Sequence, residues 1–441
     1  MDKIIKELEV IDITEEGKGV CKKDNKVYFV ENASFGEIVD IKVIKEKKNF
    51  AEGIKVNTIR KSDFYEKPDC PYFYSCDGCS TMDIEYEKEL ELKVQMVKNK
   101  LKRIGKLNLD SIEITKCPTR EGFRNKIEFK VNKMGQIGYY RAGSHQLTAI
   151  DSCIIAGKNT NLLIPRLKEL IKEHRISGYD RNSKSGEIKN ITIRENKKGE
   201  IQLTLTVRKL TREIEKLLKD IKELDNIIEV HYSINEDSKS EIMKSTTLYF
   251  RKKDYTDTIG KLKFKISPRS FFQTNALMTE KLYEEAVRQM KLKGTEKILD
   301  LYCGIGSTSL YFGQYARKVI GVEIVKDAVK DANANKEING LNNVEFVLGK
   351  SENEIARLLE KIDILVVDPP RKGLDKKLIQ EVSKSKLNKI MYISCNPGTL
   401  ARDLGLLEEI GFVTREVKLV DMFVNSMHVE IVALLVKGKN Q

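Results

Sequence analysis

The 441-residue sequence predicts an α/β protein whose C-terminal part folds as a Rossmann-like, doubly wound parallel sheet. Three observations support this fold class. Apolar strand-like runs alternate with helical patterns after residue 296, a glycine-containing loop follows the first of these runs, and short, evenly spaced apolar runs fill residues 1–60. The chain is also too long for one ordinary domain. We therefore expect a β-barrel over residues 1–60, an α+β domain over 61–260 and the doubly wound domain over 261–441.

The first sixty residues carry the pattern of a small closed barrel. Apolar runs at 10–13, 27–30 and 38–43 are separated by turn signals such as Gly17 and Gly36. OB-like barrels of this kind bind RNA or oligonucleotides, and the alternative is an interaction module without nucleic acid. The twelve Lys and Arg in residues 1–60 are balanced by twelve Asp and Glu. A basic face on the barrel would therefore have to come from the arrangement of charges.

Composition restricts the class of protein. Hydrophobic residues make up 40% of the chain, enough for sizeable cores, and the formal net charge of +13 suits a polyanionic partner. The chain has no apolar run of eighteen residues, so we expect no membrane span. Residues near the amino terminus lack the apolar core of a secretion signal. We expect a cytoplasmic protein.

Three of the eight cysteines lie close together, at Cys70, Cys76 and Cys79. Clustered cysteines in a cytosolic chain of this size favour a metal centre or catalysis over disulfides. A fourth ligand is needed, for which Cys153 is the preferred candidate and Cys117 the alternative. Four thiolates can bind zinc or an iron–sulfur cluster, and the spacing leaves both open.

The middle of the chain mixes helical and strand patterns. We expect helices over 82–104, 161–174 and 211–224, and alternating strands over 127–131 and 201–207. The segment Phe123-Arg124-Asn125-Lys126 places two cations beside an aromatic residue, which is compatible with contacts to phosphates and bases. A salt-bridged surface is the alternative interpretation of these charges.

The C-terminal part alternates strands with helices. Strands are expected at 297–302, 319–323, 344–347, 362–368, 390–394, 413–420 and 429–436. Helices are expected over 307–315 and 326–339. Cys395 follows the fifth of these strands, and Asn396-Pro397-Gly398 then turns the chain into another helix. In an open parallel sheet, ligands bind at the carboxyl ends of the strands, where Cys395 would lie.

A cysteine in that place could be a nucleophile. The amino end of the following helix favours a thiolate, which is the nucleophilic form, so we expect a lowered pKa for Cys395. The alternative is a buried, inert cysteine, because free cysteines are often buried.

The loop after the first C-terminal strand indicates a nucleoside ligand. Gly304 and Gly306 are present, but Ser309 stands where the third glycine of the dinucleotide fingerprint would be. Glu323, ending the second strand, can accept hydrogen bonds from ribose hydroxyls, and Asp368, ending the fourth, can reach a base or an amino group. Since no pyrophosphate cradle is evident, S-adenosyl-L-methionine fits better than NAD.

Five ordered motifs resemble those of the RNA (uracil-5-)-methyltransferase family. They are Ser267-Pro268-Arg269-Ser270-Phe271-Phe272-Gln273-Thr274-Asn275, Asp300-Leu301-Tyr302-Cys303-Gly304-Ile305-Gly306, Asp368-Pro369-Pro370-Arg371-Lys372-Gly373, Ser394-Cys395-Asn396-Pro397, and Asp421-Met422-Phe423 with His428-Val429-Glu430. The barrel resembles a TRAM domain, and the cysteine cluster resembles the family's four-iron–four-sulfur site. One departure is Val424, where the family usually has proline. The resemblance covers essentially the whole chain and implies a class I S-adenosylmethionine-dependent methyltransferase domain.

The resemblance also implies roles for individual residues. Cys395 would be the nucleophile and Glu430 the base, although the residues alone would suggest a surface carboxylate for Glu430 and a helix cap for Gln273. The implied S-adenosylmethionine-binding residues are Gln273, Tyr302, Glu323 and Asp368, and the implied cluster ligands are Cys70, Cys76, Cys79 and Cys153.

The function expected from the sequence is methyl transfer from S-adenosyl-L-methionine to C5 of a uridine in RNA, through a covalent bond from Cys395 to C6. The expected substrate is 23S ribosomal RNA, because the barrel and the cluster together are similar to the enzymes of that subgroup. The alternatives are a tRNA enzyme, a methyltransferase acting at another position or base, and a non-catalytic RNA-binding assembly factor. We expect a monomer that binds RNA, with no DNA and no membrane as a partner.

Overall fold

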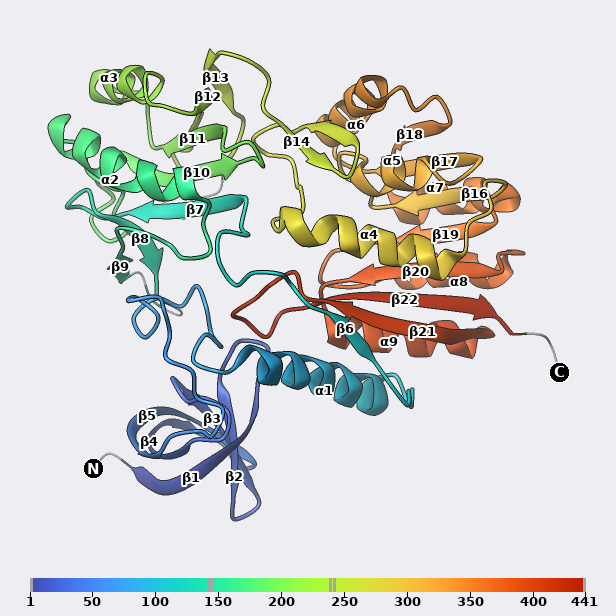
Figure 1. Cartoon of the computed structure of the whole chain (residues 1–441), viewed down its shortest axis with the longest axis horizontal. Helices are drawn as coiled ribbons and strands as arrows, with labels where there is room; N and C mark the ends of the chain where they lie inside the picture. Colours follow the sequence, from blue (N-terminus) through green and yellow to red (C-terminus); the bar gives the residue numbers. More distant parts are fainter. Residues whose placement is uncertain (1–2, 142–143, 145, 238–239, 241–242, 439–441) are drawn as a thin grey trace.

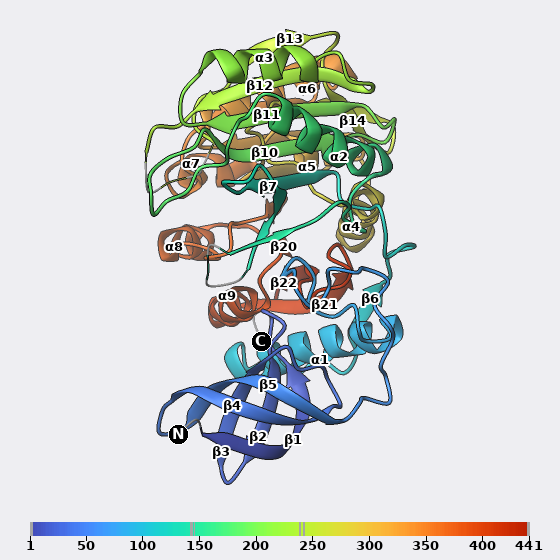
Figure 2. The same cartoon turned by 90° about the vertical axis from the view of Figure 1, so that its left-hand side faces the viewer.

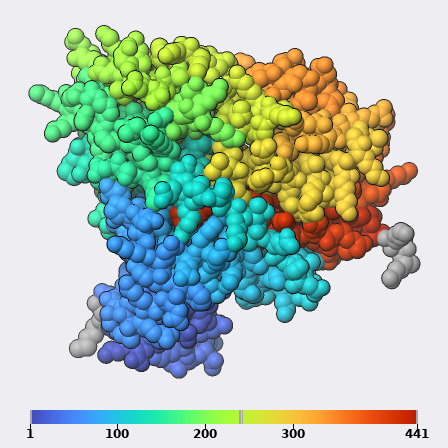
Figure 3. Space-filling view, viewed as in Figure 1, coloured from blue at the N-terminus to red at the C-terminus, as the bar shows by residue number. Residues whose placement is uncertain are grey.

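The computed structural model describes residues 3–141, 144, 146–237, 240 and 243–438. Three lobes are visible in Figures 1 and 3: the N-terminal barrel lies below, and the central and C-terminal parts lie side by side above it.

The N-terminal lobe is a closed five-stranded barrel, as the sequence predicted. Its strands, in the order β1-β2-β3-β5-β4, are β1 (Ile4–Ile13), β2 (Gly19–Lys23), β3 (Lys26–Glu31), β4 (Ile38–Glu46) and β5 (Phe50–Arg60). Alternate residues such as Val39 and Ile41 point into the barrel core, where they are fully buried. Closure leaves no free sheet edge.

Helix α1 (Tyr86–Ile104) connects the barrel to the C-terminal lobe. Figure 2 shows it between the barrel and the strands at the edge of the C-terminal sheet. It packs on α9 (Pro397–Glu409) so closely that a Cβ on Gly105 would lie 2.6 Å from the carbonyl oxygen of Ala401. The next element, β6 (Glu113–Thr115), joins the C-terminal sheet by pairing in parallel with β21 (Phe412–Val420). The domain limits drawn at residues 60 and 260 remain a prediction.

The central lobe is a seven-stranded sheet in the order β13-β12-β11-β10-β7-β8-β9. Its strands are β7 (Lys126–Val131), β8 (Ile137–Tyr140), β9 (Leu147–Ala149), β10 (Ile188–Glu195), β11 (Ile201–Val207), β12 (Ile227–Ile234) and β13 (Thr247–Arg251). The apolar face packs against α2 (Lys158–Glu173) and α3 (Arg212–Ile221), as Figure 2 shows. The alternate residues Asn190, Thr192 and Arg194 point away from these helices.

The C-terminal lobe contains an eight-stranded sheet in the order β18-β17-β16-β19-β20-β22-β21-β6. Its remaining strands are β16 (Lys297–Leu301), β17 (Lys318–Glu323), β18 (Val344–Leu348), β19 (Ile364–Val367), β20 (Lys389–Ser394) and β22 (Glu430–Lys437). The strands from β18 to β20 are parallel, and β22 runs antiparallel to both neighbours. The doubly wound fold class is therefore confirmed.

The other elements of this lobe complete the fold. They are the hairpin β14 (Thr256–Ile259) and β15 (Leu262–Lys265), the helices α4 (Ala276–Met290), α5 (Ser307–Gly313), α6 (Lys326–Asn339), α7 (Ser351–Leu358) and α8 (Lys376–Lys384), and the 3₁₀ helix η1 (Leu359–Lys361). Across the described part of the chain, no helix is both long enough and apolar enough to cross a membrane.

Candidate active site

Cys395 and Glu430 lie at the ends of two neighbouring strands. Cys395 follows β20 directly, and Glu430 is the first residue of the antiparallel strand β22. Ser394 pairs with Ile431 in an antiparallel register, so Cys395 and Glu430 both lie one residue beyond that pair, at the same edge of the sheet. Glu430 is buried, which excludes the surface carboxylate that its sequence neighbourhood alone suggested.

The expected lowering of the Cys395 pKa is wrong. Burial raises the pKa of this thiol to about 11, the carboxylates of Glu430 and Asp368 add to the rise, and the Arg371 guanidinium opposes it. The helix α9 does follow the cysteine, but the side-chain oxygen of Asn396 accepts hydrogen bonds from the amides of Gly398 and Thr399, at 2.9 and 3.0 Å. The free N–H groups that would favour a thiolate are thus occupied by the helix's own cap.

Two carboxyl groups in the site have a raised pKa. Burial raises the pKa of Asp368 to about 7, with a contribution from Asp300. Burial also raises the pKa of Glu430 well above its ordinary value, with Asp368 adding to the rise and Arg371 opposing it. A cationic ligand would favour the ionised forms of both groups.

Arg371 is a site residue that sequence reasoning missed. It belongs to the Asp368–Gly373 motif, and its charge acts on both Cys395 and Glu430. An exposed arginine after two prolines resembles any surface cation in sequence. Only its position in the motif could have pointed to the active site.

The carboxyl ends of β16 and β17 leave open space beside Gly304. Gly304 has a φ of +55°, and no atom lies within 4 Å of the position that a Cβ would occupy there. Glu323 accepts hydrogen bonds from the amides of Gly304 and Val325, at 3.1 and 2.8 Å. Its carboxylate retains acceptor capacity for hydroxyl groups. The buried Oδ1 of Asp300 has no hydrogen-bond partner among the described residues.

A cavity of about 540 Å³ lies at the same end of the sheet and is lined in part by Tyr302, Ile324 and Ser351. Tyr302 has a φ of +66°, an uncommon conformation for a bulky residue. Its hydroxyl donates to Glu352 at 3.1 Å. Ser309, which replaces the third fingerprint glycine, donates to Asp300 at 2.5 Å. The predicted cofactor residues Tyr302 and Glu323 therefore border one region of the sheet edge.

The segment that carries Gln273 is fixed by the central lobe. The Asn125 amide nitrogen donates to the carbonyl of Gln273 at 3.0 Å, and its backbone N–H donates to the carbonyl of Thr274 at 2.8 Å. Asn275, rather than Gln273, caps helix α4. Phe271 is 68% exposed, so it does not pack in the core, whereas its neighbour Phe272 is buried.

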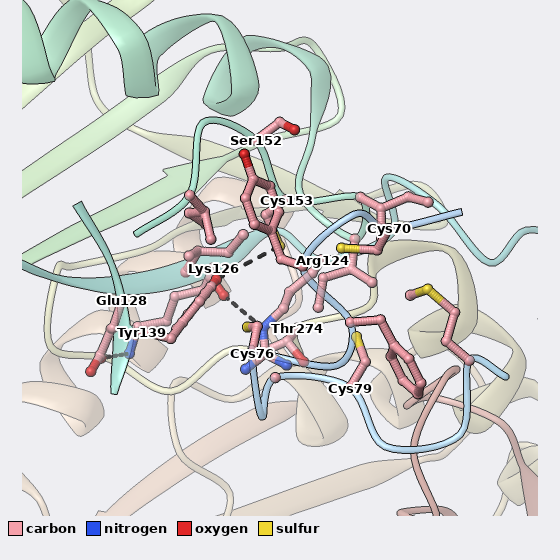
Figure 4. Close-up of a pocket in the computed structure, with 18 of the residues that line it drawn as sticks. Cys70, Cys76, Cys79, Arg124, Lys126, Glu128, Tyr139, Ser152, Cys153 and Thr274 are labelled. Carbon is pink, nitrogen blue, oxygen red and sulfur yellow. Dashed lines mark hydrogen bonds and ion pairs between the residues drawn. The ribbon is translucent and has the colours of Figure 1, made fainter. Parts of the chain in front are cut away.

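The four cysteines that the resemblance brought together do line one cavity. Figure 4 shows Cys70, Cys76, Cys79 and Cys153 around this pocket, whose volume is about 430 Å³. Burial raises the pKa of Cys76 to about 11, and the neighbouring Cys153 and Cys70 add to the rise. The hydroxyl of Tyr139 donates to the sulfur of Cys153 at 3.7 Å.

The alternative fourth ligand, Cys117, does not line this cavity. It is buried elsewhere, where its sulfur accepts a hydrogen bond from Asn275 at 3.6 Å. Within the described ranges, no group of three or more His, Cys, Asp and Glu side chains is placed to hold a metal ion.

Comparisons with known proteins agree with this geometry. Residues 85–438 match the family described as tRNA (Uracil-5-)-methyltransferase, and residues 5–56 match the TRAM domain. An uncharacterized RNA methyltransferase of Clostridium acetobutylicum is 39% identical over 97% of this chain and 96% of its own length. A second, from Bacillus cereus, is 37% identical over 96% of this chain and 95% of its own.

A solved structure resembles the whole chain. It is the Pyrococcus abyssi tRNA (uracil-54, C5)-methyltransferase in complex with S-adenosyl-L-homocysteine, which is 26% identical, with a TM-score of 0.79 over 97% of this chain and 100% of that chain. The doubly wound domain, the barrel and these similarities thus define an S-adenosylmethionine-dependent RNA methyltransferase. The chain belongs to the tRNA (uracil-5-)-methyltransferase family. The expectations of a TRAM domain and of an S-adenosylmethionine-dependent enzyme are confirmed.

Proposed function

We propose that this enzyme methylates C5 of a uridine by way of a covalent bond between Cys395 and C6, with Glu430 as the base that ends the reaction. The observation that carries the proposal is the side-by-side position of a cysteine and a buried carboxyl group at the ends of β20 and β22. A nucleophile and a base within one site are what this chemistry requires.

The proposed steps follow from the reactivity of uracil. C5 is too weak a nucleophile to take a methyl group unaided, so the Cys395 thiolate adds to C6 and creates an enolate. S-Adenosylmethionine supplies the methyl group to C5. Glu430 then takes the proton from C5, the C5–C6 double bond forms again, and the thiolate leaves. Arg371 opposes the rise in the Cys395 pKa and so assists the first step.

We propose that Gln273, Tyr302, Glu323 and Asp368 bind S-adenosylmethionine. The open space at Gly304 and the free acceptor capacity of Glu323 suit a ribose. The raised pKa of the Asp368 carboxyl suits a ligand that carries positive charge, because such a charge would favour the ionised form of this group. The test is calorimetry with S-adenosylhomocysteine on Glu323→Gln and Asp368→Asn, which should both bind more weakly than wild type.

The proposed RNA target is 23S ribosomal RNA, on the combination of a TRAM barrel with a four-cysteine cavity. The alternative is tRNA, which the likeness to the Pyrococcus abyssi enzyme supports. A paired uracil hides C6, so the target must be unpaired or flipped out of a helix. Exposed Phe271 is the proposed stacking residue, while Arg124 and Lys126 are proposed to contact flanking phosphates.

We propose a four-iron–four-sulfur cluster on Cys70, Cys76, Cys79 and Cys153. Their thiols line a single cavity, and each ligand of such a cluster bonds a different iron atom, so the sulfurs need not converge on one point. The cluster would have a structural role, because the proposed chemistry requires no electron transfer.

Two assays test the proposed function. Purified protein is incubated with S-adenosylmethionine and either 23S rRNA or tRNA that lacks the modification, and the nucleosides are separated by liquid chromatography with mass detection. We expect 5-methyluridine in 23S rRNA, and none with Cys395→Ala. Product in tRNA alone would support the alternative substrate. A methyl group on another base, or turnover by the alanine variant, would overturn the proposed reaction.

A further inference from the structure

The loop between β21 and β22, residues 421–429, leads directly into Glu430. In Figure 1 this red loop reaches away from its sheet, toward the chain segments that connect the three lobes. The buried Oε2 atom of Glu430 has no hydrogen-bond partner among the described residues. The position of the carboxyl group therefore depends on the backbone that carries it.

Asn425, in the middle of this loop, is held by residues from the first part of the chain. Its carbonyl accepts hydrogen bonds from the amides of Ser80 and Thr81, at 2.8 and 3.2 Å. Its own amide donates to Glu89 on α1 at 3.1 Å. Its side chain accepts from Nε of Arg120 at 2.9 Å and donates to the carbonyl of Arg120 at 3.2 Å. Every polar atom of Asn425 thus has a partner outside the loop.

A second anchor lies at the start of the loop. The ammonium group of Lys93, which is fully buried, bonds Asp421 and Glu89 at 2.7 Å each and the carbonyl of Phe423 at 3.2 Å. The hydroxyl of Tyr86 donates to Asp421 at 2.7 Å. Helix α1 therefore holds the loop at two points, Asp421 and Asn425.

The second half of the loop links the anchored residue Asn425 rigidly to Glu430. Met427 and Val429 are fully buried in the core that β20 and β22 share, so they leave little freedom between Asn425 and Glu430. Asn425 also has a φ of +64°, a left-handed conformation that asparagine tolerates and that glycine adopts without cost.

We propose that Asn425 is a positioning residue for the base: by anchoring the loop on α1, on Arg120 and on the segment after Cys79, it sets where the Glu430 carboxyl group lies. The inference rests on the proposed role of Glu430. On this proposal, residues in the N-terminal half of the chain influence the last chemical step by fixing the loop that carries Glu430. That step breaks the C5–H bond, moves the proton to Glu430, and breaks the bond between C6 and the cysteine sulfur as the C5–C6 double bond forms.

The variant that tests this role is Asn425→Gly, which removes both side-chain bonds to Arg120 without straining the backbone. In a single turnover with substrate RNA and S-adenosylmethionine, the protein–RNA adduct is followed on denaturing gels. We expect the adduct to form at the wild-type rate and to decay at least about fivefold more slowly, with unchanged affinity for S-adenosylhomocysteine. Arg120→Met keeps Asn425 but removes the guanidinium that donates to its side-chain oxygen, and it should also slow the decay of the adduct.

Two comparisons make the outcome decisive. Ser426→Ala removes only a hydrogen bond within the loop, to the carbonyl of Phe423. Its protein–RNA adduct should decay at the wild-type rate. Glu430→Gln should accumulate adduct, and if it forms none, the base assignment fails and this inference with it. If Glu430→Gln accumulates adduct while the adduct of Asn425→Gly decays at the wild-type rate, only the positioning role of Asn425 is overturned. Equal losses in formation and decay in Asn425→Gly would indicate a general structural defect and would overturn it as well.

Discussion

Glu430 lies beside Cys395 where the neighbouring strands β22 and β20 end, and its carboxylate helps to raise the pKa of the thiol. The nucleophile and the proposed base therefore oppose each other when both are ionised. Burial raises the pKa of both groups. The free enzyme thus holds its cysteine mainly as the thiol at neutral pH.

The first prediction concerns the reactivity of Cys395 toward iodoacetamide in the free enzyme. Because only the thiolate reacts and the pKa is raised to about 11, the alkylation rate should rise about tenfold per pH unit between pH 7 and about pH 10. Peptide mass spectrometry follows Cys395 separately from the other cysteines. A rate that is already constant above pH 8 would contradict the raised pKa.

The neighbouring charges should move this rate in opposite directions. Glu430→Gln removes an anion that raises the Cys395 pKa, so alkylation at pH 9 should be faster than in wild type. Arg371→Gln removes a cation that lowers it, so alkylation should be slower. Shifts of the same sign in both variants would indicate a change of access to the thiol rather than of its charge.

The second prediction separates the two chemical roles. Glu430→Gln should still form the adduct, since the base acts only after methyl transfer, and should release it about a hundred- to ten-thousand-fold more slowly, the usual contribution of a general base. Time courses on denaturing gels measure the release. Cys395→Ser, as the matched control, should give almost no adduct. Rapid release by the glutamine variant would assign the base to another residue.

The order of strands and helices could be predicted from the sequence because it depends on local patterns. The apolar run before Cys395 and the turn at Asn396-Pro397-Gly398 predicted a strand end and a helix start, and β20 and α9 confirm both. The pKa of Cys395 could not be predicted from the same stretch. It depends on burial and on Glu430 and Asp368, which other strands bring to the site.

Helix α1 illustrates the same limit. The sequence predicts a helix over residues 82–104, and the structure has α1 over Tyr86–Ile104. Glu89 and Lys93 on this helix are fully buried, because Asp421 and Asn425, more than three hundred residues away in the chain, supply partners that no local pattern reveals. Strand β6 was missed since three residues are too few to show a periodic pattern.

The third prediction tests these buried charges. Lys93→Met removes the buried cation that bonds both Glu89 and Asp421, so stability should fall by about 3–5 kcal/mol. Urea unfolding followed by far-ultraviolet circular dichroism measures the change. Lys281→Met is the matched control, because its ion pair with Glu284 on α4 is largely exposed, and it should cost less than about 1 kcal/mol. Equal effects would show that burial does not set the difference.

The fourth prediction concerns the cysteine cavity. Anaerobically purified protein should contain iron and absorb broadly in the visible range, and Cys153→Ser should lose most of both signals. Cys117→Ser is the matched control, since Cys117 lies outside the cavity, and it should keep them. Iron analysis together with the absorption spectrum provides the test. Stoichiometric zinc without iron would replace the proposed cluster with a zinc site.

The last prediction concerns how RNA is held while a base leaves its stack. Phe271 is 68% exposed and lies two residues before Gln273. Together with Arg124 and Lys126, it lines the cavity that Cys70, Cys76, Cys79 and Cys153 also line. Stacking on an aromatic ring contributes about 1–3 kcal/mol per base, so Phe271→Ala should weaken RNA binding between about fivefold and about 150-fold. Filter binding with a ribosomal RNA fragment measures the affinity.

Two controls separate stacking from a general loss of binding. Leu162→Ala, at an equally exposed apolar position on α2, should leave RNA affinity unchanged. Calorimetry with S-adenosylhomocysteine should give the wild-type affinity for Phe271→Ala, because the exposed ring lies outside the core that supports Gln273. Phe271→Tyr keeps an aromatic face and should restore most of the RNA affinity. An alanine variant that binds RNA as tightly as wild type would exclude Phe271 as a stacking residue.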